Sequence, residues 1–307
     1  MNKVHISGYG SILYFIYRST FITLLLPFLV SFNTDSIWIV ILGSIFGYFL
    51  LSFYLKIAQK NKYDNIIVGI DKKVFKGIGF ILNTLLAIGI LYFFILLFTK
   101  LTIFTGTEYL KGTPTILISL LFLFIIIYIG RKDIETVSRA SLIFFMVSFI
   151  LLIVKFSGLW NQLDFSNLLP IFTHKPTSLL VGSLKYASIG ILPLFLILLI
   201  NPKDITPTKR IKQKTKWFYI LTSSILFINV LLILTVLGPE LLSLYNYPEV
   251  HLLRNIKLLG FMDRLEPLLS IQWIIDMVIC LSICFIYIKT YFLYYGKKTL
   301  RFITSKV

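Results

Sequence analysis

The sequence predicts an all-α polytopic membrane protein with eight transmembrane helices. Hydrophobic residues make up 57% of its 307 residues, they collect in eight long runs, and positive charge concentrates in every second loop. A helix needs about 20 mostly apolar residues to cross a hydrocarbon core about 30 Å thick. Because a helix satisfies its backbone polar groups within one segment, each run is expected to be helical inside lipid. The expected spans are Gly10–Ser31, Ser36–Ile57, Gly77–Phe104, Thr113–Ile129, Ala140–Trp160, Ser178–Ile200, Lys216–Leu237 and Pro267–Phe292.

Each span is justified by its length, and two of them contain an informative proline. Thr113–Ile129 is the shortest, but it still falls within the about 17–25 residues that can cross a bilayer. Pro27 lies in the first span and Pro193 in the sixth. These prolines predict either ordinary kinks or two discontinuous helices that face each other as the first members of two inverted repeats. The chain is then one transmembrane domain over residues 1–307, with one repeat at about residues 10–160 and an incomplete second repeat at about residues 178–292.

Basic residues predict the orientation of the chain. The loops after the second, fourth and sixth runs and the C-terminal tail are rich in Lys and Arg, whereas the opposite loops are sparse or, after the seventh run, balanced by acids such as Glu249. Cytoplasmic loops carry the excess of Lys and Arg, so both termini are expected in the cytoplasm. The formal net charge is +17. Because this charge flanks the spans, we expect anionic lipids as its counter-charge and no nucleic-acid partner.

The sequence contains no pattern typical of an enzyme, a cofactor site or a metal site. His5, His174 and His251 lie far apart and have no ligand spacing. Cys280 and Cys284 lie one helical turn apart within the eighth span, where packing is the simpler role. Neither a phosphate-binding loop nor a nucleophile motif occurs. We therefore expect a protein that is not an enzyme and that carries neither a cofactor nor a metal.

Charged residues inside the predicted spans are the strongest functional signal. Arg18, Lys185 and Asp276 each lie about eight residues from the start of a run, which is ~12 Å of helix rise. A charge at that depth costs about 2.5–3.5 kcal/mol even on the lenient insertion scale. We therefore expect Asp276 to pair with Lys185 or Arg18, as part of a ligand site or as a static salt bridge that fixes helix register. Lys155 and Lys289 lie nearer the ends of their spans, where long side chains can reach the headgroups.

Polar and small residues around these charges define a candidate ligand site between the first and sixth spans. Gln272, Asp276, Cys280 and Cys284 repeat every four residues and should form one stripe on the eighth span. An amino-acid ligand needs one partner for its carboxylate and one for its ammonium, and buried charges or helix ends can supply both. The candidate ligand-binding residues are Arg18, Ser19, Thr20, Lys185, Ser188, Gly190, Gln272 and Asp276.

Three short segments carry a recognisable pattern. Residues 163–170 read Leu-Asp-Phe-Ser-Asn-Leu-Leu-Pro, residues 236–241 read Val-Leu-Gly-Pro-Glu-Leu, and residues 261–266 read Phe-Met-Asp-Arg-Leu-Glu, with Trp273 shortly after. They resemble the corresponding segments of the spore germination permeases, which are the B subunits of nutrient germinant receptors. The resemblance extends over roughly residues 12–295.

This resemblance implies a LeuT-like inverted-repeat bundle of the amino acid–polyamine–organocation transporter superfamily, with a small-molecule site between the first and sixth spans. It implies a membrane subunit of a spore nutrient germinant receptor that senses or passes a small germinant such as an amino acid. The implied partners are an A-type and a C-type receptor subunit, and the implied location is the spore inner membrane.

The chain also departs from the family pattern. Arg18 and Thr20 stand where members usually have a glycine pair, Ile191 replaces a frequent glutamate, and eight spans replace the usual ten. Two alternatives therefore stay open: a stand-alone amino-acid or cation transporter, and an assembly subunit that binds no ligand.

Overall fold

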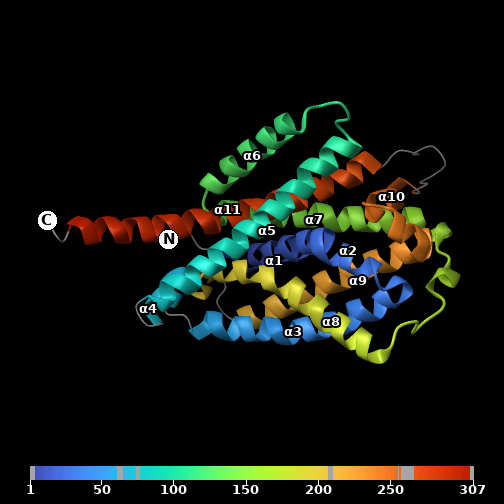
Figure 1. Ribbon diagram of the computed structural model, residues 1–307, viewed down its shortest axis with the longest axis horizontal. Coiled ribbons are helices and arrows are strands. Elements are labelled where there is room, and N and C mark those ends of the chain that lie inside the picture. The colour runs from blue at the N-terminus through green and yellow to red at the C-terminus, as the bar shows by residue number, and fades with distance from the viewer. Residues whose placement is uncertain are drawn as a thin grey trace.

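The computed structural model describes residues 4–60, 65–73, 77–206, 210–254, 256 and 266–304. It is almost entirely helical, and most of the long helices run side by side along the long axis of the molecule, while α5 and α6 cross them obliquely (Figure 1). The described residues include seven helical segments long and apolar enough to cross a membrane. The predicted class, an all-α polytopic membrane protein, is confirmed. Residues 261–265, part of one pattern-bearing segment, lie outside the described residues.

The helices follow the predicted runs but differ at their ends, most of all at α11, which continues to Thr304 and not to Phe292 as predicted. The eighth candidate crossing, α6, has 17 residues, at the low end of the length that spans a bilayer, so the count of eight stays a prediction. The helices are α1 (Ile6–Thr20), α2 (Leu26–Val30), α3 (Ser36–Lys60), α4 (Ile66–Lys73), α5 (Ile78–Glu108), α6 (Thr115–Arg131), α7 (Ile134–Leu159), α8 (Pro176–Ile191), α9 (Ile211–Leu244), α10 (Pro248–Arg254) and α11 (Glu266–Thr304). Two residues of β1 (Val4–His5) pair in parallel with β2 (Ile205–Thr206).

Both prolines mark a change of helix type. A π-helical turn, η1 (Phe21–Leu25), joins α1 to α2, and Pro27 is the second residue of α2. Pro27 has no N–H to donate to the preceding turn, and a π turn is one way in which a helix absorbs such a mismatch. Pro193 lies at the start of a 3₁₀ helix, η5 (Leu192–Leu199), which continues α8. The helical path continues through both sites, so the structure favours altered helices over discontinuous ones.

The seventh span breaks at Gly238, and here two of the pattern-bearing segments meet. Gly238 has φ +78°, a conformation that glycine adopts readily, and Pro239 follows inside α9. Pro239 cannot donate to the carbonyl of Thr235, four residues earlier. The amide side chain of Asn167 and the backbone N–H of Asp164 donate to that carbonyl instead, both at 3.1 Å. Residues of the segment 163–170 thus supply the hydrogen bonds to Thr235 that Pro239 cannot donate within α9.

The first span lies at the centre of the bundle. All residues of α1 except Ser7 are buried, and α1 contacts α7, α9 and α11. The outer helices have the opposite character, since Leu85 of α5 and Phe124 of α6 are exposed. Exposed apolar side chains along such helices suit a lipid environment. The charged residue of α1, Arg18, is therefore placed deep inside the bundle.

Candidate functional site

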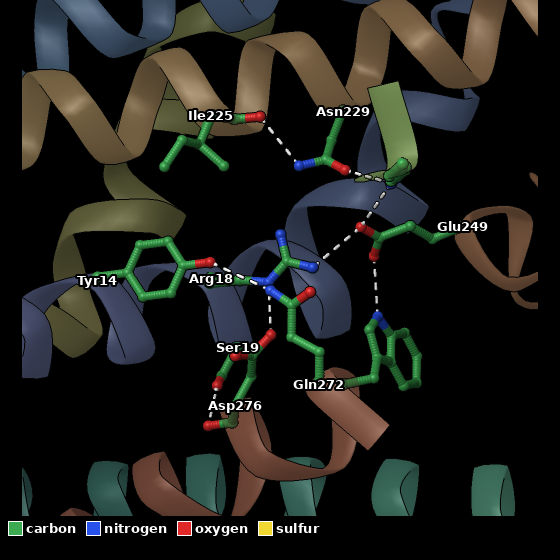
Figure 2. A network of polar contacts seen from close by, with 10 residues as sticks. Tyr14, Arg18, Ser19, Ile225, Asn229, Glu249, Gln272 and Asp276 are labelled. Carbon is green, nitrogen blue, oxygen red and sulfur yellow. Dashed lines mark hydrogen bonds and ion pairs between the residues drawn. The ribbon is translucent and has the colours of Figure 1, made fainter. Parts of the chain in front are cut away.

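Four charged side chains from four helices meet beside α1. We call Arg18 of α1, Lys155 of α7, Glu249 of α10 and Asp276 of α11 the charged cluster. All four are at least nine-tenths buried. Figure 2 shows Arg18, Glu249 and Asp276 with polar residues around them. A buried charge is strongly penalised unless it is paired and hydrogen-bonded, so the contacts within this cluster determine whether it is stable.

Arg18 connects the two acids. Its Nε lies 2.5 Å from Asp276 Oδ2, and its Nη2 lies 3.2 Å from Glu249 Oε1. The predicted pairing of Asp276 is therefore confirmed for Arg18. Ser19 Oγ donates to the backbone carbonyl of Asp276 at 2.9 Å, which ties the same two helices together. Gln272 lies one turn away on α11, and its Nε2 is 3.4 Å from the hydroxyl of Tyr14.

Glu249 connects Arg18 to a second cation that sequence reasoning placed elsewhere. Lys155 Nζ lies 3.4 Å from Glu249 Oε1 and donates to Asn229 Oδ1 at 2.5 Å. The expectation that Lys155 reaches the headgroups is therefore wrong, because Glu249 and Asn229 offer it partners inside the bundle. Trp273 Nε1 donates to Glu249 Oε2 at 2.9 Å. Both carboxylate oxygens of Glu249 are thus engaged.

The electrostatics of the cluster are balanced, with two cations facing two anions. Burial alone would raise the pKa of Glu249, but Arg18 and Lys155 outweigh it and lower that pKa below its usual range. Asp276 Oδ1 is the exception to full pairing, since it is buried and makes no hydrogen bond among the described residues. The cluster is consequently neutral overall and has one acceptor left over.

The other predicted site residues do not all join this cluster. Thr20 Oγ1 donates to the carbonyl of Ile16 in its own helix. Ser188 is exposed and likewise donates within its helix, to the carbonyl of Leu184. Gly190 packs against Tyr17, so tightly that a Cβ there would lie 2.7 Å from Cε2 of that ring. Arg18, Ser19, Gln272 and Asp276 are brought together, whereas Thr20, Ser188 and Gly190 contribute no polar group to them.

Lys185 lies in a different place from the one predicted. It is exposed on α8 and makes none of the ion pairs found among the described residues. It lines a separate cavity of about 720 Å³ together with His174 and Lys175, near the start of α8. The helix period alone does not determine which face of α8 points into the bundle. Lys185 lies on the outward face, so it has no contact with Asp276 that could support a shared site.

A cavity of about 220 Å³ adjoins the charged cluster on the side of Glu249. We call it the Glu249 cavity. Lys100 of α5 also lines it, with its Nζ 4.6 Å from the centre of the Tyr247 ring. The remaining lining residues include Ile22, Leu26, Pro27, Tyr245, Asn246, Pro248 and Trp273.

A signal for Glu249 and Lys155 exists in the sequence. Lys155 lies within an apolar run, and Glu249 directly follows Pro248, a residue type that often begins a helix. Placing Glu249 in an exposed loop missed α10, a helix of seven residues that packs against α9 and α11. Among the described residues, no group of three or more His, Cys, Asp or Glu could hold a metal ion.

Comparisons with known proteins give a consistent result. The profile of a family described as Spore germination protein matches residues 11–300. Spore germination protein A2 of Bacillus subtilis (strain 168) is 26% identical over 259 residues, or 80% of this chain and 67% of that protein. Spore germination protein XB of Bacillus anthracis is 26% identical over 212 residues, covering 67% of this chain and 58% of that protein.

A third relative matches a shorter stretch. YfkT of Bacillus subtilis (strain 168), whose name describes it as a candidate spore germination protein, is 27% identical over 167 residues, or 54% of this chain. The matched regions span 45%, 67% and 58% of the lengths of YfkT, protein A2 and protein XB.

Proposed function

We propose a function from the premise that the chain belongs to the spore germination protein family: it is a transporter-like membrane subunit of a nutrient germinant receptor. In this proposal it binds a small zwitterion, such as an amino acid, and it is not an enzyme. The three relatives are named for spore germination, which supports the receptor role. The seven apolar helices support an integral membrane protein of this kind.

The observation that carries the proposal is the neutral charged cluster beside the Glu249 cavity. A free cation that entered this cavity would add a buried charge without an acid to balance it, because Glu249 already balances Arg18 and Lys155 and because Lys100 also lines the cavity. A zwitterion adds no net charge. Its ammonium can meet Glu249, and its carboxylate can meet Lys100, which lines the same cavity. When the ammonium draws Glu249 away, Arg18 loses one partner and becomes available to a carboxylate.

This arrangement gives the predicted site residues distinct roles. Arg18 is the deep carboxylate partner, and Asp276 holds Arg18 in place through the 2.5 Å contact. Ser19 and Gln272 support the two helices that carry these charges. Lys185 and Ser188 have no role here because they lie on the exposed face of α8.

The site is tested by binding of radiolabelled amino acids to the purified chain in lipid nanodiscs. We expect saturable binding of a neutral amino acid, weakened at least about tenfold by Lys100→Met because a charge-assisted hydrogen bond is lost. Lys111→Met is the matched control, since Lys111 is also a lysine but is exposed and does not line the Glu249 cavity. Equal loss in both variants, or no binding at all, would refute the site.

An assembly subunit without a ligand is the second candidate, and one observation favours it. Arg18, Lys155 and Glu249 already satisfy one another, and Tyr17 fills the space beside Gly190 where a site between the first and sixth spans would lie. If this candidate is correct, no amino acid binds, but substitution of Arg18 still reduces recovery of the receptor complex.

The partners and the surroundings are further parts of the proposal. We propose A-type and C-type receptor subunits as partners, anionic lipids around the basic loops, a LeuT-like inverted repeat, and the spore inner membrane as the location.

The orientation of the chain is a separate part of the proposal. Both ends of the described chain lie toward the same end of the bundle (Figure 1), which fits two cytoplasmic termini. A cysteine at Thr208, outside the described residues, should react with an impermeant reagent only from the cytoplasmic face. Labelling from outside would reverse the assigned orientation.

A further inference from the structure

The cavity that Lys185 lines has a cationic lining. It lies between the end of α2 and the start of α8, at the end of the bundle away from both termini (Figure 1). We call it the Lys185 cavity. Its volume is about 720 Å³, within the range of about 300–1,000 Å³ of small-molecule pockets. Lys175, Lys185 and His174 line it, and none of its described lining residues is acidic. The cavity thus combines space for a ligand with two lysine charges.

Lys185 is the unusual member of this lining, because it lies inside a membrane-spanning segment. It follows Pro176, the first residue of α8, by nine residues, which is ~14 Å of helix rise. A charge at such a depth is costly and is usually paired. Neither its ammonium nor that of Lys175 makes an ion pair among the described residues. The two cations therefore favour an anionic ligand.

Asp35 is the acid beside this cavity, and its carboxylate is already engaged. It is fully buried and accepts from the backbone N–H groups of Phe172 at 2.7 Å and His174 at 2.9 Å. The hydroxyl of Thr173 donates to it at 2.8 Å, and His174 Nδ1 lies 2.9 Å from it. Asp35 therefore stabilises the wall of the cavity at residues 172–174 and is not available to the lysines.

One face of α8 forms another wall. The lining residues of α8 follow a spacing of three, four and seven residues, which places them on one side of the helix; they are Ser178, Val181, Gly182 and Lys185. A Cβ at Gly182 would lie 3.0 Å from Cζ of Phe32, so the glycine lets this ring pack against α8. Side chains on a helix lean toward its N-terminus, and Lys185 is thus directed toward Lys175. The wall is apolar at Phe32 and cationic at the lysines.

We propose that the Lys185 cavity binds a phosphate group with net negative charge. Its oxygens would accept from the ammonium groups of Lys175 and Lys185, since lysine binds phosphate as a point charge. An anionic phospholipid is one source, because Phe28 and Phe32 line the same cavity and offer contacts to an acyl chain, and basic pockets between membrane helices bind lipid head groups. Free phosphate is the other source. The site lies away from the Glu249 cavity, and neither proposal depends on the other.

Photolabelling with a lipid probe tests this site. The purified chain in phosphatidylcholine nanodiscs receives a trace of phosphatidylglycerol that carries a diazirine in one acyl chain, and adducts are mapped by mass spectrometry. We expect adducts within residues 28–32 and 173–185. The exposed face of α5, with Leu85 and Tyr92, is the internal reference, because any lipid can contact it. Relative to this reference, the probe should label the cavity at least about fivefold more than phosphatidylcholine with the same diazirine chain.

Substitution of Lys185 tests the recognition of charge. Lys185→Met should lower this labelling ratio about fivefold, because a charge-assisted contact is lost, whereas Lys185→Arg keeps the charge and should retain the ratio within about twofold. Lys111→Met is the matched control, since Lys111 is also an exposed lysine but does not line the Lys185 cavity. The melting temperature of every variant confirms folding, and Lys175→Met replaces Lys185→Met if that variant does not fold.

Competition distinguishes the two sources of phosphate. If inorganic phosphate lowers the labelling ratio and sodium chloride at the same ionic strength does not, free phosphate occupies the cavity; an unchanged ratio assigns it to the lipid. An equal ratio in Lys185→Met and Lys111→Met would overturn the proposal. Equal labelling by the two lipids, together with no rise in melting temperature on addition of inorganic phosphate that depends on Lys185, would overturn it as well.

Discussion

Replacing Glu249 with glutamine is the most direct test of the charged cluster. Glutamine keeps the size of the side chain and an oxygen that can accept from Trp273, whose contact to Glu249 is 2.9 Å. The change removes only the negative charge. Arg18 and Lys155 are then left with Asp276 as the remaining acid of the cluster, so the buried cluster carries one excess positive charge.

The expected loss follows from the burial of the pair. Glu249 and Lys155 have side chains only 3% and 7% exposed, and removing one partner of a buried ion pair costs about 3–5 kcal/mol. For a large domain, about 1 kcal/mol shifts the melting temperature by about 2 °C. We therefore expect Glu249→Gln to lower the apparent melting temperature by about 6–10 °C. Adding Lys155→Met should recover part of this loss, because it restores neutrality.

The assay is thermal unfolding of the purified chain in one detergent, followed by the monodisperse fraction after heating. Glu108→Gln is the matched control, because Glu108 pairs with Arg254 at 2.7 Å while 44% of the Arg254 side chain is exposed. A pair of this kind contributes about 0–1 kcal/mol, or no more than about 2 °C. If Glu249→Gln shifts the melting temperature no further than Glu108→Gln does, Glu249 is not part of a buried charge balance.

Three further outcomes follow from the same contacts. Asp276→Asn should lower folded yield, and adding Arg18→Met should partly recover it; an unimproved double variant would contradict the pairing. Gly190→Leu should reduce folded yield and not merely block a cavity, because even a Cβ there would lie 2.7 Å from the Tyr17 ring. Burial, which opposes ionisation, is outweighed by the two cations, and the pKa of Glu249 falls from 4.5 to about 2. Its contribution to stability should thus be complete above about pH 5 and be lost as the pH falls through about 2, so the acid-induced drop in melting temperature should be smaller in Glu249→Gln.

The fold class was predictable because it depends on composition along the chain. The apolar runs determine where helices form, because a helix satisfies its backbone polar groups inside lipid. The structure differs from the prediction mainly at helix ends and at short helices such as α4 and α10. The helix type at Pro27 and Pro193 was not predictable. Proline cannot donate a backbone hydrogen bond, and a π turn and a 3₁₀ stretch can both accommodate that missing donor. The contact between Asn167 and Thr235 was equally hidden, because it joins a loop to a helix that begins more than 40 residues later.

The site was only partly predictable, because depth along a helix does not determine the direction of a side chain. Arg18, Lys185 and Asp276 lie at similar predicted depths, yet Lys185 faces outward on α8 while the other two pair. The sequence therefore left two candidate partners for Asp276, Arg18 and Lys185, and could not show which of them points into the bundle. The structure decides it through packing, since α1 is the buried centre of the bundle and α8 is only partly covered.

Charge balance indicates that Arg18 and Asp276 need further charged partners if another cation is buried beside them. Arg18, Asp276 and a second cation at the same depth would have left one buried positive charge without an acid, which a stable membrane protein avoids. That imbalance calls for another carboxylate, and Glu249 lies beside a proline that can begin a short helix. Lys155 then enters as the cation that Glu249 balances, in place of Lys185. The two acids and two bases found together in the structure therefore balance one another, so that all four side chains are buried without net charge.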